Sequence, residues 1–203
     1  MSISAQDHGR ISAAIHAAEA RTSGEIVCVL ALASCDATAL PILIAALAAL
    51  ALPWLLVAFT AMPVNLILLL QLVVFFVLAA LLCLPRVRVA LAPRAARRAI
   101  AHRAAMEQFT IRGIGRKKDR TGVLIFVSLA ERYARIIADQ GIATRVPQSQ
   151  WQGAVDALTA EMSGGHIADG FIAAVDRCGK VLEQHFPRSE SSRDELPDRI
   201  YVI

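Results

Sequence analysis

Residues 37–85 contain no Asp, Glu, Lys, Arg or His, and this uncharged tract limits the chain to very few folds. The tract is 49 residues long, whereas one helical span of a bilayer's hydrocarbon core needs about 20 apolar residues. Two spans with a tight connection therefore fit. The segment from Thr60 to Pro63 is the one interruption near the middle. We therefore expect membrane helices over 39–60 and 64–84, each roughly 31–33 Å long.

A helical hairpin buried in a soluble core is the principal alternative interpretation of the tract. It would require the roughly 150 remaining residues to cover an uncharged surface of this size on every side, and so short a chain cannot do that. A secretory signal peptide is also a poor interpretation, because the tract begins near residue 37 and no basic segment leads directly into it. We therefore predict a membrane hairpin, with the lipid bilayer as its first partner.

The arginines around the tract predict how the hairpin is oriented. Six arginines follow the tract within about 20 residues, Arg21 precedes it, and the connection near Met62 has none. Positive charge collects on the cytoplasmic side, and two spans return the chain to the side on which it started. We expect a two-span inner-membrane protein with both termini and the polar domain in the cytoplasm. The four cysteines form no CxxC pair, so nothing demands an oxidising compartment.

The polar segments on either side of the tract are predicted to form one domain. Residues 25–33 are a nearly continuous apolar run rich in β-branched residues, which is typical of a strand buried on both faces. Such a strand cannot stand alone, so its partners must come from beyond the hairpin. Runs at 122–128 and 133–138 supply them, and the short link between these two predicts an antiparallel pair. The hairpin is therefore an expected insertion into a single domain.

Helices complete the predicted domain. Apolar residues at helical spacing precede the first strand and recur at 93–110, 148–162 and 167–186. This order predicts an α/β fold class, a small layered sandwich with few strands that a transmembrane helical hairpin interrupts. The expected boundaries are 1–36 for the first part of the domain, 37–85 for the hairpin, 86–186 for the remainder of the domain and 187–203 for a polar C-terminal tail. The closing residues 196–203 are the part of this tail that could dock on the domain.

Charge is concentrated in one segment of the chain. The formal net charge is only +4, yet residues 86–120 carry 11 basic against 2 acidic side chains. This basic segment directly follows the predicted membrane exit, where anionic headgroups attract Lys and Arg by about 1 kcal/mol each. We therefore expect anionic headgroups as a partner of 86–120. Nucleic acid is not an expected partner, because few aromatic residues are interleaved and no recognisable binding motif is present.

The sequence lacks the common catalytic motifs. It has no HExxH, no Gly-x-Ser-x-Gly and no paired Cys/His spacing, so we predict no metal centre and identify no catalytic residues. Because α/β domains bind ligands at strand ends, the polar residues there are candidates for binding an anion or a metal. The simpler interpretation is that they solvate a turn in surface ion pairs worth at most about 1 kcal/mol. The candidate residues are Glu25, Arg120, Glu131, Arg132 and Asp139.

Four blocks of the sequence, in this order, resemble the TPM domain. They are Glu19-Ala-Arg-Thr-Ser-Gly-Glu-Ile-Val, Phe109-Thr-Ile-Arg-Gly-Ile-Gly115, Arg120-Thr-Gly-Val-Leu-Ile-Phe-Val-Ser128 and Glu131-Arg-Tyr-Ala-Arg-Ile-Ile-Ala-Asp-Gln-Gly-Ile142. The closing pair of helices with Gly170-Phe171 extends the resemblance over nearly all the polar residues. The chain is most similar to bacterial membrane proteins of this family in which a two-helix hairpin interrupts the domain after its first strand. The resemblance implies a small α/β sandwich.

The resemblance also suggests a range of functions. Members of the family have been associated with weak acid phosphatase activity, calcium binding, photosystem II maintenance and accessory function at a receptor. We expect a non-enzymatic accessory or assembly factor for a membrane protein complex, with calcium implied by the resemblance alone. The alternative is a weak membrane-bound acid phosphatase with its site around Glu25, Arg120, Glu131 and Asp139. A small transport subunit is disfavoured because the hairpin has no ionisable residue.

Overall fold

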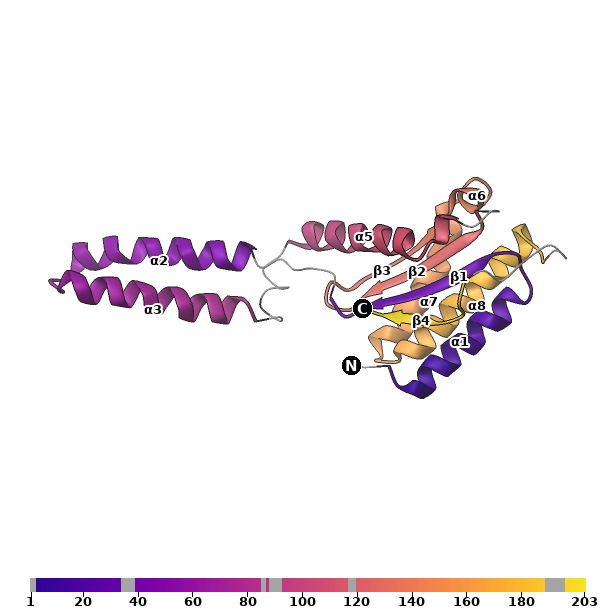
Figure 1. Ribbon diagram of the computed structural model, residues 1–203, viewed down its shortest axis with the longest axis horizontal. Helices are drawn as coiled ribbons and strands as arrows, with labels where there is room; N and C mark the ends of the chain where they lie inside the picture. The colour runs from indigo at the N-terminus through magenta and orange to yellow at the C-terminus, as the bar shows by residue number, and fades with distance from the viewer. Residues whose placement is uncertain (1–2, 34–38, 85–86, 88–92, 117–119, 189–195) are drawn as a thin grey trace. The chain divides into compact units, whose positions relative to one another are not determined.

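The computed structural model describes residues 3–33, 39–84, 87, 93–116, 120–188 and 196–203 (Figure 1). Two compact units make up the chain. The hairpin unit is Cys35–Ile100, and the α/β unit combines Met1–Ser34 with Ala101–Ile203. The α/β unit is thus built from two separate stretches of sequence, and the hairpin unit lies between them along the chain.

The α/β unit begins with helix α1, Ala5–Glu19. Ser4 caps it, because its hydroxyl accepts a hydrogen bond from the Asp7 N–H while the Asp7 carboxylate accepts from the Ser4 N–H, a reciprocal capping box. Ile11, Ile15 and Ala18 form its buried face. A short turn then leads into strand β1, Glu25–Ala31, in which every residue is buried.

A mixed sheet of four strands in the order β3-β2-β1-β4 is the centre of this unit. Strand β2, Gly122–Ser128, runs parallel to β1, and strand β3, Tyr133–Ala138, runs antiparallel to β2. The prediction of an α/β sandwich with an antiparallel pair is confirmed. Because β1 and β2 pair over their full length, the segments before and after the hairpin form one sheet.

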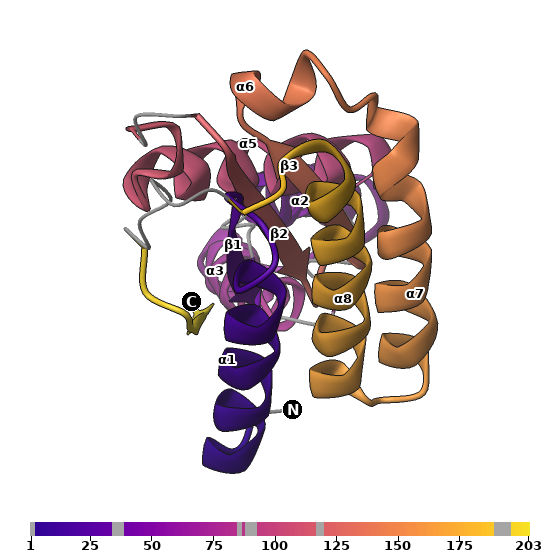
Figure 2. The ribbon, with the colours of Figure 1, turned by 90° about the vertical axis from the view of Figure 1, so that its right-hand side faces the viewer.

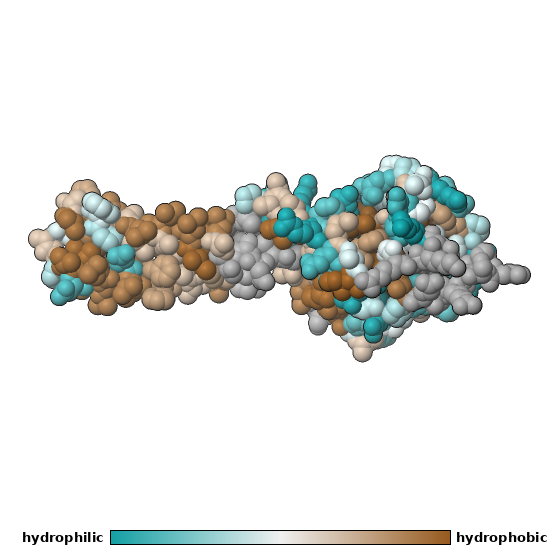
Figure 3. Space-filling model, turned by 45° about the horizontal axis from the view of Figure 1, so that its top comes forward, coloured by the Kyte–Doolittle hydropathy of each residue, from teal (hydrophilic) through white to brown (hydrophobic). Residues whose placement is uncertain are grey.

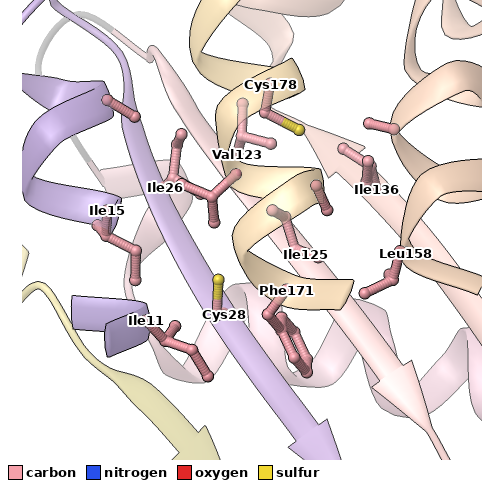
Figure 4. Close-up of a cluster of buried hydrophobic side chains, with 14 of the residues drawn as sticks. Ile11, Ile15, Ile26, Cys28, Val123, Ile125, Ile136, Leu158, Phe171 and Cys178 are labelled. Atoms are coloured by element: carbon pink, nitrogen blue, oxygen red, sulfur yellow. The ribbon is translucent and has the colours of Figure 1, made fainter. Parts of the chain in front are cut away.

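Three helices cover one face of the sheet (Figure 2). They are α1, α7 (Gln152–Ser163) and α8 (Ile167–His185), and η2, a 3₁₀ turn at Gln148–Trp151, leads into α7. Figure 4 shows side chains from these helices and from the strands meeting in one apolar layer. Alternate residues of β1 and β2 point into this layer, as the two-residue period of a strand requires. The layer contains Ile11, Ile15, Ile26, Cys28, Val123, Ile125, Ile136, Leu158, Phe171 and Cys178.

A smaller apolar cluster covers the opposite face of the sheet. Helix α5, Arg94–Ile111, contributes Ala105, with Ala104 packed against the cluster, and the 3₁₀ turn η1, Ile114–Arg116, contributes Ile114. The small alanine side chains allow the helix to lie close to Val29 and Phe126. Helices on both faces therefore explain why β1 and β2 are apolar at almost every position.

Helices α2, Ala39–Phe59, and α3, Val64–Leu82, form the hairpin unit. Pro53 lies inside α2, and Pro63 immediately precedes α3. Only Pro41, Ala45 and Ala49 of α2 and Ile67 of α3 are buried, so small residues line much of the helix contact. The hairpin helices are predominantly brown in the hydropathy view of Figure 3, whereas the α/β unit shows many teal residues among pale and brown ones.

The closing residues of the predicted tail, 187–203, dock on the sheet. Ile200–Val202 forms strand β4, which runs parallel to β1, and the Ile203 N–H donates to the Leu30 carbonyl over 2.9 Å. The physical reason is that β1, buried on both faces, needs a partner on each edge. Smaller differences lie at element ends: the first strand stops at Ala31, and a four-residue helix α6, Gln140–Ala143, replaces a simple turn.

Candidate functional site

The five candidate residues lie at opposite ends of the sheet. Glu25 begins β1, Arg120 precedes β2, and Asp139 follows β3, which places these three at the end where the parallel strands start. Glu131 and Arg132 lie in the turn between β2 and β3, at the other end. A strand of seven residues separates the two ends by roughly 20 Å. The residues therefore form two separate groups, one at each end of the sheet.

At the amino end, two buried carboxylates flank a glycine. Glu25 is paired in register with Gly122, and the Asp139 N–H donates to the Gly122 carbonyl over 2.9 Å. Residues in one row of a sheet point to the same face, so both carboxyl groups lie on the face that η1 covers. Their residues are 3% and 8% exposed. By strand spacing their Cα atoms are about 9–10 Å apart.

Ile114 covers the gap between these carboxylates. A Cβ built on Gly122 would lie 2.3 Å from Ile114 Cγ2 and 3.1 Å from the Ile114 carbonyl oxygen. The close approach of η1 therefore depends on glycine at this position. The turn therefore packs closely on the sheet between Glu25 and Asp139.

Asp139 holds the end of β3 through its backbone and one carboxylate oxygen. Oδ1 accepts a hydrogen bond from the Gln140 N–H over 2.6 Å and so caps helix α6, while Oδ2 is buried without a hydrogen-bond partner among the described residues. Arg120 lies nearby, and its guanidinium donates to the Gln140 side-chain oxygen over 2.8 Å. Arg120 is exposed and adopts a φ of 50°, in the left-handed region. This group can offer a carboxylate and a guanidinium to a ligand.

At the carboxyl end, Ser128 and Glu131 fix the turn between β2 and β3. The buried Ser128 hydroxyl donates to the buried Glu131 carboxylate, and the Arg132 N–H donates to the Leu129 carbonyl over 3.2 Å. Arg132 has a φ of 50° and an exposed side chain. The hydrogen bonds are local, so they account for these residues as parts of a tight turn. Sequence reasoning missed Ser128 because a serine at a strand end is not distinctive.

A surface pocket of about 230 Å³ lies between α1 and the start of α8. Arg10 crosses it, with its guanidinium 2.5 Å from Asp169 Oδ1 and 3.5 Å from Asp7 Oδ1. The hydroxyl of Ser4 donates to the Asp7 carboxylate over 2.7 Å and holds the pKa of that carboxyl below its ordinary value. Arg10 is thus neutralised by two neighbours. No local sequence pattern predicts this group, since Arg10 and Asp169 are 159 positions apart.

The described residues do not fit a metal centre, and the two thiols of the core are not reactive. No cluster of three or more His, Cys, Asp or Glu side chains occurs among them, whereas calcium takes six to eight oxygen ligands. The calcium that the resemblance implies therefore has no matching ligand set in the described part of the chain. Burial raises the pKa of both core thiols, Cys28 and Cys178, so they stay protonated and unreactive.

The hairpin unit offers a different kind of surface. Helices α2 and α3 are long and apolar enough to cross a membrane, with a mean hydropathy of 2.6 and 2.8 over their most apolar windows. Only 11% and 6% of those windows are buried. Large side chains such as Trp54 and Phe59 are more than four-fifths exposed. An outward apolar surface of this extent on two adjacent helices marks an interaction with lipid or protein.

The fold and these surfaces define a layered α/β domain with an apolar helical hairpin inserted after its first strand. The family model of the TPM domain matches residues 85–181, so the chain contains a TPM domain. The match begins after the hairpin, yet β1 completes the same sheet in three dimensions. No curated protein gives a significant match to the chain.

A solved structure has a similar fold. The NMR structure of the BA42 protein from the psychrophilic bacterium Bizionia argentinensis superposes with a TM-score of 0.62 and 19% sequence identity. The alignment covers 100% of this chain and 97% of that chain. At this identity the likeness concerns the fold alone.

Proposed function

We propose that the protein is a membrane-anchored TPM-domain protein that acts as a non-enzymatic accessory or assembly factor for a membrane protein complex. One observation carries the anchoring part of the proposal, namely the outward apolar surface of α2 and α3. A core helix of a soluble protein would be mostly buried, whereas at most 11% of either apolar window is buried here. The hydrocarbon core of a bilayer solvates such an apolar surface favourably.

The proposed topology places the α/β unit in the cytoplasm of a cell with an inner membrane. The two spans return the chain to its starting side, and the arginines after residue 85 favour the cytoplasmic side by the positive-inside rule. In this arrangement both halves of the α/β unit meet on one side of the bilayer. The pairing of β1 with β2 requires both segments to lie on the same side, because a sheet cannot form across a membrane.

The accessory role is supported by the chemistry of the candidate residues. These residues divide between the two ends of the sheet. The hydrogen bond from Ser128 to Glu131 stabilises the turn between β2 and β3. Arg10 is neutralised by Asp7 and Asp169. None of these groups combines a nucleophile with a base and an open pocket, which enzymes of the common hydrolase classes require. A protein or lipid partner is the simpler use of the large apolar surface.

Reporter fusions in bacterial cells test the anchoring. Fusions at Met62 and at the C-terminus should report opposite sides of the membrane, and the full chain should stay in the membrane fraction after an alkaline carbonate wash. Matching signals from the two fusions, or release by the wash, would contradict the proposal. Native gels of gently solubilised membranes should then show the protein in a defined complex larger than the monomer. Migration as a monomer alone would count against an assembly role.

A weak membrane-bound acid phosphatase is the second candidate, and the amino-end group favours it. The name of the matched family model refers to a phosphatase. Two buried carboxylates and the exposed Arg120 are the residue types that could exchange protons with a phosphate ester and bind its charge. Hydrolysis of p-nitrophenyl phosphate by the purified full chain that E25Q or D139N abolishes, and that the surface variant D156N does not, would establish this activity. Equal rates in all four proteins would exclude it.

A further inference from the structure

We propose that the exposed arginines of α5 bind the anionic headgroups of the membrane, so that this helix is a second, electrostatic attachment of the α/β unit. The residues concerned are Arg94, Arg98 and Arg103, which we call the α5 arginines. The inference rests on the proposed function, because it requires the hairpin to be inserted in a bilayer. To the proposed anchoring, this inference adds an anionic lipid surface as a partner and α5 as the element that binds it.

Helix α5 carries positive charge that makes no ion pair with other described residues. Its first buried residue is Ala101, and all three α5 arginines are exposed. None of them makes an ion pair or a hydrogen bond with another described residue. By contrast, Arg10 is paired with Asp169, and Arg177 donates to the Gly153 carbonyl. The α5 arginines are therefore available to an external anion.

Helix stability does not account for Arg94, in the first turn of α5, either. The first turn of α5 contains no acidic residue, and the positive end of the helix dipole lies there. Arginine in that position opposes the dipole, whereas an acidic side chain would support it. Positive charge in the first turn therefore lowers the stability of the helix, and binding of an anion from outside the protein offsets this loss.

The chain connection favours lipid over other anions. Arg94 follows Leu82, the last residue of α3, by 12 positions, so an extended connection reaches at most about 43 Å. The residues within about 20 positions of a span are those whose positive charge meets the headgroup region. Single-stranded nucleic acid would require stacking side chains, and Phe109 is the only aromatic residue between 86 and 120. When the hairpin is inserted in a bilayer, lipid phosphate lies within the reach of this connection.

Amide hydrogen exchange in nanodiscs tests this proposal on the full chain. Nanodiscs of phosphatidylcholine alone are compared with nanodiscs that also contain phosphatidylglycerol. The α5 amides should exchange about ten-fold more slowly in the anionic discs, since each headgroup contact adds to the stability of the helix. High salt should remove the difference, because the Debye length falls to about 3 Å at 1 M.

Charge-matched variants identify the residues. The variant R94Q/R98Q/R103Q should lose the lipid-dependent protection, whereas R132Q/R135Q/R145Q, which removes three exposed arginines of the α/β unit, should keep it. Equal α5 exchange in both discs, with the α2 and α3 amides protected in both, would overturn the headgroup contact and leave the anchoring intact. Unprotected α2 and α3 amides in both discs would overturn the anchoring and the headgroup contact together.

Discussion

Gly122 determines how closely η1 can approach the sheet. A Cβ at this position would lie 2.3 Å from Ile114 Cγ2, so Gly122→Ala must displace the turn or the strand. We expect a loss of about 1–3 kcal/mol in the free energy of unfolding, the usual cost of overpacking. Urea unfolding of the detergent-solubilised chain, followed by the fluorescence of the buried Trp151, measures it.

Gly9 provides the matched control. It lies inside α1, and a Cβ built on it would meet no atom within 4 Å. Gly9→Ala should therefore stabilise the chain by roughly 0.5–1 kcal/mol, because alanine is the better helix former. If both substitutions changed the stability in the same direction, the close packing of Ile114 on Gly122 would not be the cause.

The capping box of α1 makes a prediction about pH. The Ser4 hydroxyl and N–H both bond the Asp7 carboxylate and lower its pKa from the ordinary 3.8. A depressed folded-state pKa stabilises the fold fully above 3.8, and the stabilisation is lost as the pH falls through the lower folded value. In Ser4→Ala the pKa of Asp7 should rise toward 3.8, which an NMR titration of the carboxyl carbon measures. An unchanged Asp7 pKa would contradict the role of Ser4.

Among the secondary-structure elements, β4 makes the clearest test of packing. Ile200 is 4% exposed and belongs to the main core cluster, whereas Val202 on the same strand is 42% exposed. Ile200→Ala should cost about 2–4 kcal/mol because it leaves a cavity, and Val202→Ala should cost less than about 1 kcal/mol. Chemical unfolding of the two variants side by side checks this. Similar small losses in both would mean that the C-terminal strand contributes little to the sheet.

The strands also show which parts of the fold the sequence could predict. β1, β2 and β3 were predictable because each is a run of apolar residues bounded by polar or glycine positions. β4 has only three residues and follows a charged segment, so it is too short for a two-residue hydrophobic pattern to identify it as a strand. Its pairing with β1 depends on contacts far apart in the chain, which local pattern does not encode.

The candidate site was predictable only in part, for the same reason. Residue type and position at strand ends selected Glu25, Asp139 and Arg120, which the structure does place at one end of the sheet. Glu131 and Arg132 were grouped with them because the chain places them near β2, but they lie beyond its opposite end. The row formed by Glu25, Gly122 and Asp139 arises from strand register across three separate segments. Register is a tertiary property, so only the structure identifies this row.

At the scale of the whole molecule, the α/β unit contains elements that lie outside the segment matched by the TPM family model. The match covers 85–181, but α1, β1 and β4 lie outside it. β1 is a central strand that pairs with β2 on one edge and β4 on the other. The matched segment alone would expose the edge of β2 that pairs with β1. The foldable unit is therefore the discontinuous α/β unit, and the hairpin unit is an insertion into it.

This relation predicts that the hairpin can be removed but β1 cannot. A chain in which a flexible Gly/Ser linker joins Ala33 to Pro93 should fold as a water-soluble protein, because the deletion removes no contact within the α/β unit. A chain that keeps the hairpin but lacks residues 1–33 should not fold its α/β unit, since β2 loses its parallel partner along seven register pairs. Amide dispersion in NMR spectra and urea unfolding distinguish the outcomes. A linker chain without cooperative unfolding would show that the hairpin is an integral part of the domain, and a folded chain lacking β1 would show that the segment matched by the family model is sufficient.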